Sequence, residues 1–222
     1  MEGVNERNNF IYFTLALVTL LLVSALVDTM PAGEGRLLLR LIILATEIVA
    51  FVSLSFDKQV RAFIAFMVIL MVVAGILDEL TDVPGAPVFG LTVLLVFFLV
   101  IAFSVGRRVL LAGNADSNTI IGSLAVYLLL GLIWATLYLL SLEFFPDAFN
   151  GIERSNWSDN FSNAAYFSFV TMTSLGYGDI SPALPLTRAL AYLQAIAGAF
   201  FMAIVVASLI GVRTSQRTKP KN

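Results

Sequence analysis

The stretch Thr173-Ser174-Leu175-Gly176-Tyr177-Gly178-Asp179 decides how this chain is organised. A short apolar segment, Phe161–Met172, comes directly before it, and a long uncharged segment, Ala189–Val212, follows it. Its two glycines are separated by one residue. Glycine lacks a Cβ atom and adopts left-handed backbone conformations without a steric penalty, so this spacing indicates an unusual local backbone. The stretch is therefore a loop of special conformation between apolar segments.

The composition places the chain in a membrane. Hydrophobic residues make up 59% of it and charged residues only 13%, far from the averages of soluble domains. Several apolar runs reach the ~18 residues that a membrane-spanning helix needs. The chain has no cysteine and no histidine, which excludes disulfides, thiolate metal sites and the usual general base. We expect an all-α integral membrane protein.

The apolar pattern predicts six transmembrane helices and one shorter, re-entrant helix. The short helix, Phe161–Met172, follows a polar run at 156–160 and cannot cross a bilayer. Such a half-helix is tolerated only where protein or water surrounds it. Ser158, Asp159 or Asn160 is expected to cap its N-terminus. The six predicted spans are Phe10–Val27, Leu37–Phe56, Ala62–Leu77, Val88–Gly106, Thr119–Leu142 and Ala189–Val212.

The distribution of Lys and Arg predicts the orientation, because cytoplasmic loops carry an excess of these residues. If the N-terminus is inside, most basic residues fall on the cytoplasmic side and most acidic residues on the outer side. Both termini are then cytoplasmic, and the expected location is the plasma membrane. The basic residues on the predicted cytoplasmic side are Arg7, Lys58, Arg61, Arg107, Arg108, Arg213, Arg217, Lys219 and Lys221.

The heptapeptide resembles the selectivity filter of potassium channels, whose fingerprint is T-x-x-G-Y-G-D between an outer and an inner pore helix. The resemblance covers residues 119–211 well. Six spans with the pore after the fifth resemble the bacterial type of the voltage-gated-like cation channel superfamily. The resemblance implies a sensor-like domain at 1–112, a pore domain at 113–212 and a short basic tail at 213–222. One filter per chain implies a homotetramer around a tetrameric pore.

By this resemblance, residues Thr173 to Gly178 bind K⁺. The ion contacts are the backbone carbonyls of Ser174, Leu175, Gly176 and Tyr177, with the Ser174 hydroxyl in the innermost ring. Such carbonyls replace the hydration shell of the ion. The family usually has Thr in place of Ser174 and often Val in place of Leu175. These two departures bear on ion affinity and filter stability.

Other residues are expected to support the filter. The resemblance places Asp179 at its outer end, where it accepts a hydrogen bond from Tyr166. Tyr166 and Phe167 stand where the family often has a Trp pair, and packing in the membrane core is the simpler interpretation of both. Gly198 lies 20 residues after Gly178, the spacing of an inner-helix hinge in the family. Close packing among small residues explains Gly198 equally well.

The first four spans do not resemble a working voltage sensor. A sensor needs several arginines in its fourth span, but Val88–Gly106 contains no charge. We therefore expect weak or no voltage dependence. Glu47 is the one acid deep within a span, and Arg40, seven residues earlier, is too far away for an easy contact. We expect Glu47 to make a polar contact with another span.

The sequence predicts a potassium-selective channel that conducts passively, with K⁺ ions, the lipid bilayer and three further copies of the chain as partners. No cofactor beyond the permeant ion, no nucleic acid and no enzymatic activity are expected, since no nucleophile–base–acid cluster is present. Two alternatives stay open. One is a poorly selective cation channel, and the other is a non-conducting subunit that modulates other channel chains.

Overall fold

The computed structural model describes residues 9–27, 29–54, 58–80, 85–111, 117–153 and 155–217. Within them the chain forms seven helices and a pair of two-residue strands. The helices are α1 (Asn9–Val27), α2 (Ala32–Ser53), α3 (Lys58–Leu80), α4 (Ala86–Leu111), α5 (Ser117–Phe144), α6 (Phe161–Met172) and α7 (Pro185–Arg217). The strands are β1 (Phe149–Asn150) and β2 (Ser181–Pro182).

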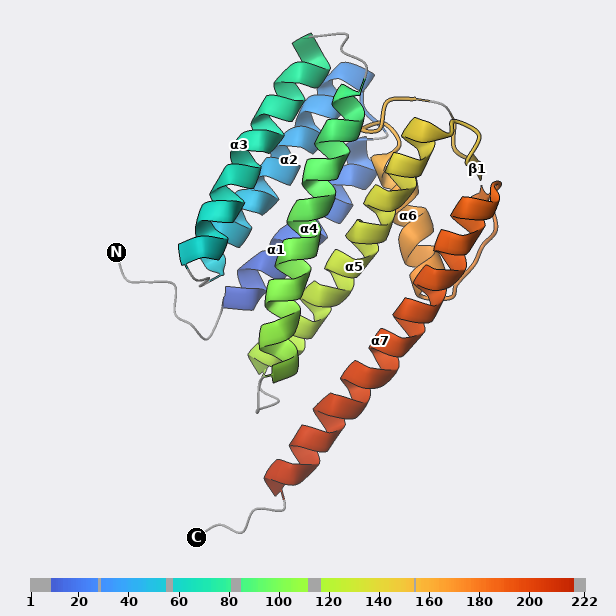
Figure 1. Ribbon diagram of the computed structural model, residues 1–222. Helices are drawn as coiled ribbons and strands as arrows, with labels where there is room; N and C mark the ends of the chain where they lie inside the picture. Colours follow the sequence, from blue (N-terminus) through green and yellow to red (C-terminus); the bar gives the residue numbers. More distant parts are fainter. Residues whose placement is uncertain are drawn as a thin grey trace.

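The long helices run side by side with alternating directions (Figure 1). α1, α3 and α5 run one way, and α2, α4 and α7 run the other way. The start of α1 and the end of α7 therefore lie at the same end of the molecule. α6 is much shorter, and it ends partway along the height of the bundle (Figure 1). This is the arrangement expected for a re-entrant half-helix.

Five of these helices are long and apolar enough to cross a membrane, namely α1, α3, α4, α5 and α7. The chain is thus a multi-pass membrane protein. α2 has a similar length of 22 residues, but Arg36, Arg40 and Glu47 interrupt its apolar sequence. The predicted span at 37–56 therefore remains a prediction. Its helix starts and ends earlier than expected, at Ala32 and Ser53.

α1 illustrates why apolar sequence alone makes these helices. In lipid every backbone N–H and C=O must be paired within the segment, which a helix achieves. Phe13, Leu17 and Leu20 share one face of α1 and are fully buried against the other helices. Leu15 and Leu22, equally apolar, are 57% and 63% exposed on the opposite face. An apolar exposed face fits contact with lipid, not with water.

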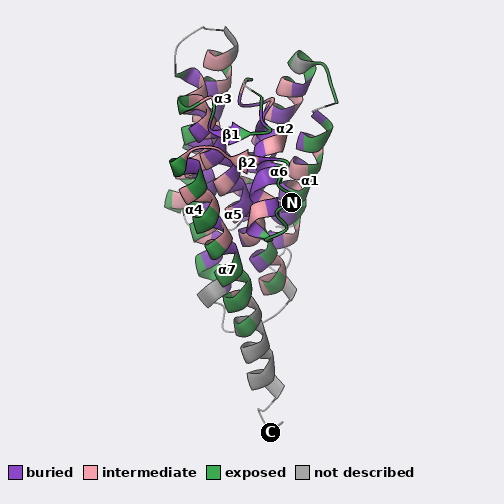
Figure 2. Ribbon diagram, turned by 90° about the vertical axis from the view of Figure 1, so that its right-hand side faces the viewer, coloured by how far each residue is buried: buried purple, intermediate pink, exposed green. Residues whose placement is uncertain are grey.

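α5 is the centre of the fold, and α7 stands at its edge. Buried residues make up 56% of the apolar stretch of α5 but only 17% of that of α7. α1, α4 and α6 all pack on α5. α7 contacts α6 and α5 and is largely exposed along its described length (Figure 2). The α6–α7 side of the molecule therefore has a large uncovered surface.

Some sequence predictions fall at or beyond the limits of this description. The predicted boundary between residues 112 and 113 and both chain ends, 1–8 and 218–222, lie outside the described residues. The last helix continues to Arg217, five residues past the predicted end at Val212. The first part of the predicted basic tail is therefore helical.

Candidate functional site

The half-helix α6 is held against α5 by a close backbone approach. The Ser168 hydroxyl donates a hydrogen bond to the Gly131 carbonyl at 2.6 Å. A Cβ atom at Gly131 would overlap the ring of Phe169, so a larger residue at this crossing would displace that ring. α5 and α6 therefore pack with the small-residue contact typical of helices within membranes.

A buried polar network connects α6 to both neighbouring helices. The Gln194 amide on α7 donates to the Ser168 carbonyl at 2.9 Å and to its hydroxyl oxygen at 2.7 Å. The Tyr138 hydroxyl on α5 donates to the Gln194 carbonyl oxygen. All three side chains are fully buried. Sequence reasoning did not identify this network. Its only signal was Gln194, the single amide within the long apolar segment 189–212.

The loop 173–179 begins by folding back under the end of α6. The Leu175 N–H donates to the Val170 carbonyl at 2.9 Å, and the Ser174 N–H donates to the Thr171 carbonyl at 3.0 Å. The Thr173 hydroxyl donates to the Phe169 carbonyl at 2.7 Å. These bonds satisfy carbonyls that would otherwise be left unpaired at the end of the helix. They also fix where the loop starts relative to α6.

The backbone of this loop has a left-handed residue at every second position. The φ angles of Ser174, Gly176 and Gly178 are 59°, 58° and 83°. Ser174 is the only residue other than glycine with positive φ among the described residues. A left-handed conformation costs a residue with a Cβ about 1–2 kcal/mol, whereas glycine adopts it freely. Both sequence-predicted glycines thus lie where their conformational freedom is used.

The side chains of the loop are exposed within a single chain. Leu175 is 54% exposed and Tyr177 is 67% exposed. No ring contact between Tyr177 and the aromatic residues of α6 is present within the described residues. Phe167 instead packs against Tyr138 and Phe149, with ring centroids 5.0 and 5.3 Å apart. Phe167 is therefore buried in the core, and its support of the filter stays a prediction.

Asp179 and Tyr166 lie together at the other end of the loop. The Tyr166 hydroxyl donates to Asp179 Oδ2 at 2.8 Å, the contact expected from the sequence. This hydrogen bond holds the pKa of Asp179 below its ordinary value and raises the pKa of Tyr166. Both groups therefore keep their usual charge at neutral pH, Asp179 negative and Tyr166 neutral.

A two-stranded ladder anchors the chain just after Asp179. β1 and β2 pair antiparallel, with Asn150 opposite Ser181. Gly151 follows β1 with a φ of 83°, and a Cβ atom there would overlap the Asp179 carbonyl oxygen. No sequence signal indicates the contact of Gly151 with the loop, because the two segments are about 30 residues apart. The ladder ties the exit of the loop to the segment after α5.

Gly198 lies at the contact between α7 and the end of α6. A Cβ atom at this position would come within 2.5 Å of the Met172 carbonyl oxygen. α7 runs as one continuous helix from Pro185 to Arg217 through this point. Close packing therefore accounts for Gly198, and the hinge stays a prediction.

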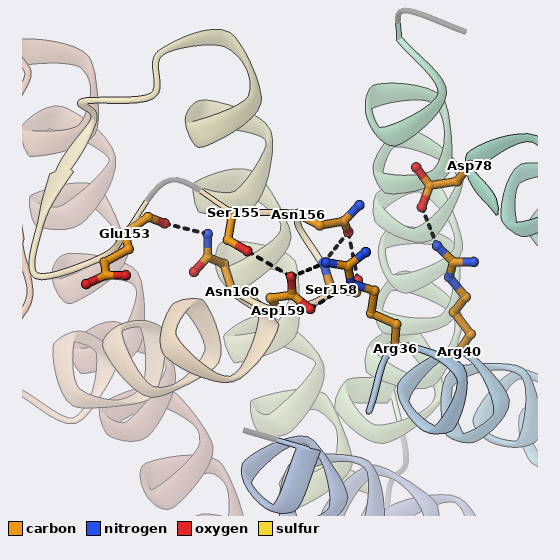
Figure 3. Close-up of polar contacts among 9 residues, drawn as sticks. All are labelled: Arg36, Arg40, Asp78, Glu153, Ser155, Asn156, Ser158, Asp159 and Asn160. Carbon is orange, nitrogen blue, oxygen red and sulfur yellow. Dashed lines mark hydrogen bonds and ion pairs between the residues drawn. The ribbon is translucent and has the colours of Figure 1, made fainter. Parts of the chain in front are cut away.

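A cluster of polar side chains surrounds the start of α6 and is drawn in Figure 3. Arg36 on α2 donates from Nε and Nη2 to the two oxygens of Asp159, at 2.9 and 2.8 Å. Ser155 donates to the same carboxylate at 2.8 Å. The hydrogen bonds from Arg36, more than that from Ser155, hold the pKa of Asp159 below its ordinary range. The sequence did not predict this link between α2 and α6.

The predicted side-chain cap of α6 is wrong. Asn160 occupies the cap position but has helical backbone angles and makes no capping hydrogen bond. Its amide instead donates to the Glu153 carbonyl at 2.9 Å. Asp159 is engaged by Arg36, and Ser158 donates to Asn156. The polar run thus bonds to the loop before the helix and to α2.

Glu47 does not make the expected polar contact with another span. Its side chain is fully buried, and neither carboxylate oxygen has a hydrogen-bond partner among the described residues. Arg40, the nearest basic residue along α2, pairs with Asp78 on α3 instead. Within the described residues, no group of three or more Asp and Glu side chains is arranged to hold a metal ion.

Comparison with known proteins places the loop within a recognised family segment. Residues 124–214 match the family described as "Ion channel", which is less than half of the chain. The matched range runs from α5 through α6, the loop 173–179 and most of α7. The family is one of channels, and the site just described lies at the centre of the match.

Two plant proteins of Arabidopsis thaliana are similar to this region. One is "Two-pore potassium channel 4", 34% identical over 79 residues, which is 36% of this chain and 26% of the relative. The other is "Two-pore potassium channel 5", 34% identical over 86 residues, which is 39% of this chain and 20% of the relative. The chain therefore spans about a quarter or less of the length of these relatives. No solved structure was found to match it.

Proposed function

We propose that this protein is a subunit of a potassium-selective channel that conducts K⁺ passively through a ring of backbone carbonyls. The observation that carries the proposal is the loop 173–179, in which Ser174, Gly176 and Gly178 alternate in the left-handed conformation. The similarity of this region to potassium channels supports the same ion. In this function, residues Thr173 to Gly178 line the conduction path.

The chemistry follows from the cost of removing water from an ion. An unpaired charge loses tens of kcal/mol of solvation on transfer to a medium of low dielectric constant. Alternating backbone conformations let successive carbonyl groups turn to the same side, so the carbonyls of Ser174, Leu175, Gly176 and Tyr177 can replace that water. The Ser174 hydroxyl would add a ligand at the inner end. The C-terminal end of α6 also favours a nearby cation, because its macrodipole is negative there.

A carbonyl ring requires more than one chain, and we propose a homotetramer. The loop residues Leu175 and Tyr177 are more than half exposed within one subunit. On α7, Ile196 and Phe200 are 50% and 64% exposed, four residues apart on one helix face. Apolar residues beside an exposed polar loop fit a subunit interface around an axis better than they fit lipid. Closed rotational symmetry is the usual solution for identical chains.

We further propose that α2 also crosses the membrane, which gives six spans with both termini on the cytoplasmic side. The alternating directions of α1 to α5 and α7 support this topology (Figure 1). Without α2 as a span, α1 and α3 would have to run in opposite directions across the bilayer, but they run in the same direction. The plasma membrane is the expected location of such a channel.

Ser174 and Leu175 favour one rival function, a cation channel of poor selectivity. Ser174 adopts the left-handed conformation but lacks the methyl group of Thr, which would pack beside the loop. Leu175 is bulkier than the Val that the family often has at this position. A loosely held loop would select less strictly among ions. A poorly selective channel would have the same fold and the same pore but would not prefer K⁺ over Na⁺.

Reconstitution of the purified protein in liposomes and planar bilayers tests the proposal. We expect K⁺ flux, and a reversal potential close to the K⁺ equilibrium potential in mixed Na⁺ and K⁺. Reversal near zero would favour the poorly selective rival. A stable tetramer without flux would contradict conduction and favour a modulatory subunit.

A pair of glycine variants links the flux to the loop. Gly178→Ala places a Cβ at a left-handed position in the loop, and we expect it to abolish K⁺ flux. Gly85→Ala is the matched control, because Gly85 also has a positive φ of 97° and open space around it, yet lies before α4. Equal flux in both variants would show that ions take another path.

A further inference from the structure

A cavity of about 480 Å³ lies among α2, α3 and α4, away from the loop 173–179. This volume is within the range of ligand sites in proteins, which is roughly 300–1,000 Å³. Its lining is mostly apolar and includes Leu44 on α2 and Met71 on α3. Trp157, from the segment just before α6, also lines it.

Small residues create this hollow. The small lining residues include Ala74 and Gly75 on α3 and Ala86 and Gly90 on α4. A Cβ atom built at Gly75 would meet no other atom within 4 Å, so the space beside it is open. Protein interiors are normally packed without voids larger than a water molecule. A hollow of this size therefore calls for an occupant.

One wall of the cavity is polar. Arg40 on α2 forms an ion pair with Asp78 on α3, visible in Figure 3. Arg40 Nη1 also donates to the Gly75 carbonyl at 3.3 Å. Only 14% of the Arg40 side chain and 7% of the Asp78 side chain are exposed. Asp78 is two residues from the end of α3, whereas Arg40 is more than two turns inside α2.

The rim of the cavity opens toward the apolar outer surface of the helices. Leu37 and Leu41 on α2 are 60% and 54% exposed, and Ile76 on α3 is 51% exposed. In a membrane protein such residues face hydrocarbon. Water needs two to four polar partners in a cavity, and away from the Arg40–Asp78 wall the lining residues are almost all apolar. The hydrocarbon of the adjacent bilayer is therefore the medium that fills the space.

We propose that this cavity is a binding site for a membrane phospholipid. One acyl chain lies in the hollow beside Gly75 and reaches Trp157, and the headgroup rests against the Arg40–Asp78 pair. An acyl chain is surrounded by apolar groups both in the bilayer and in the cavity. The hydrophobic effect therefore does not favour the cavity over the bilayer. Its preference comes from filling the hollow and from the charged pair at its polar end.

Fluorescence of Trp157 tests the proposal, and the test does not depend on ion conduction. The chain has two tryptophans, so Trp134→Phe leaves Trp157 as the only one. This variant is reconstituted in vesicles of phosphatidylcholine with brominated acyl chains, because bromine quenches tryptophan on contact. Trp157 lines the cavity and is only 4% exposed, so a lipid in the cavity is better placed to touch it than lipid at the outer surface. We expect most of its fluorescence to be lost, and an unquenched Trp157 would overturn the proposal.

A filled cavity provides the matched comparison. Gly75→Leu in the same background projects a side chain into the hollow, and we expect it to restore most of the Trp157 fluorescence. Val73→Leu adds bulk on the same helix but outside the cavity, and should leave the quenching unchanged. Equal quenching in a folded Gly75→Leu protein would overturn the proposal. Native mass spectrometry of the wild-type protein tests the proposal without a variant. If no phospholipid stays bound to the protein after detergent washing, the proposal is overturned.

Discussion

At Gly198, α7 lies in close contact with the end of α6. The Met172 carbonyl oxygen occupies the space that a Cβ would need, and a backbone atom cannot move aside as a flexible side chain does. A glycine at this position therefore has two explanations, a hinge and a close contact. The two explanations predict opposite effects of an added methyl group on the stability of the protein.

For Gly198→Ala we expect a loss of stability of about 1–3 kcal/mol, the usual cost of overpacking. Alanine is the better helix former, so a residue that served only as a hinge would gain stability from this change. Thermal unfolding of the purified protein in detergent measures the effect. Gly106→Ala on α4 is the control, because its Cβ would meet only Val126, at 4.0 Å. A more stable Gly198→Ala protein would contradict the contact.

Gln194 is the residue on which the buried network depends. For Gln194→Leu we expect a loss of about 1–3 kcal/mol, because the buried Tyr138 hydroxyl is left unsatisfied, whereas the Ser168 hydroxyl keeps its hydrogen bond to the Gly131 carbonyl. Thermal unfolding again measures it, together with Tyr138→Phe and the double variant. Since the two residues are bonded, the double variant should lose less than the sum of the single losses. Additive losses would mean that the hydrogen bond contributes nothing.

At the scale of elements, the Arg36–Asp159 pair joins the first four helices to the half-helix α6. Its side chains are 36% and 23% exposed, so solvent screens the pair and its contribution to stability is ~1 kcal/mol or less. The pair matters more for the relative position of α2 and α6 than for the free energy of unfolding. Two parallel hydrogen bonds fix the distance and the angle between α2 and the start of α6.

The pH dependence of this pair follows from the lowered pKa of Asp159. A depressed carboxyl pKa gives stability that is present above the unfolded value, 3.8, and is lost as the pH falls through the folded value. We expect the stability difference between wild type and Asp159→Asn to stay constant between about pH 5 and pH 8 and to shrink only at more acidic pH. Thermal unfolding across pH measures it. A difference that vanishes already near neutral pH would show that another group controls it.

The sequence predicts the elements better than it predicts their connections. Apolar runs such as 119–142 indicate α5 directly, because a helix is what lipid imposes on such a run. The loop 173–179 was also predictable, since two of its three left-handed positions are glycines. The pairing of Arg36 with Asp159 joins residues 123 positions apart, and no local pattern indicates it. The same holds for Gly151, whose partner is a carbonyl of the loop.

The limits of α2 show a further difficulty. Its start at Ala32 was missed because Glu34 and Arg36 interrupt the apolar run, although both lie within the helix. Charged residues in the first turns of a helix can reach partners outside it, as Arg36 does. Hydropathy alone places the start of the helix after these charged residues, whereas the helix begins before them, at Ala32.

At the scale of the whole molecule, we propose that the first four helices form a sensor-like domain, in which two arginines of α2 are held in fixed contacts. Arg36 is bonded to Asp159, and Arg40 is paired with Asp78 and bonded to the Gly75 carbonyl. In a sensor of this kind α4 would be the moving helix, and its charges are Arg107 and Arg108 near its end. A sensor that responds to the membrane potential must move charge through the field. This arrangement leaves little charge free to do so.

We therefore expect a shallow dependence of open probability on voltage. Moving one charge through the full field yields about 2.3 kcal/mol per 100 mV, so steep gating needs several charges in each subunit. Single-channel recording in planar bilayers from negative to positive potentials measures the slope. Arg107→Gln with Arg108→Gln should leave that slope unchanged, since both residues lie near the end of α4, outside most of the field. A steep slope that this double variant abolishes would show that α4 does carry gating charge.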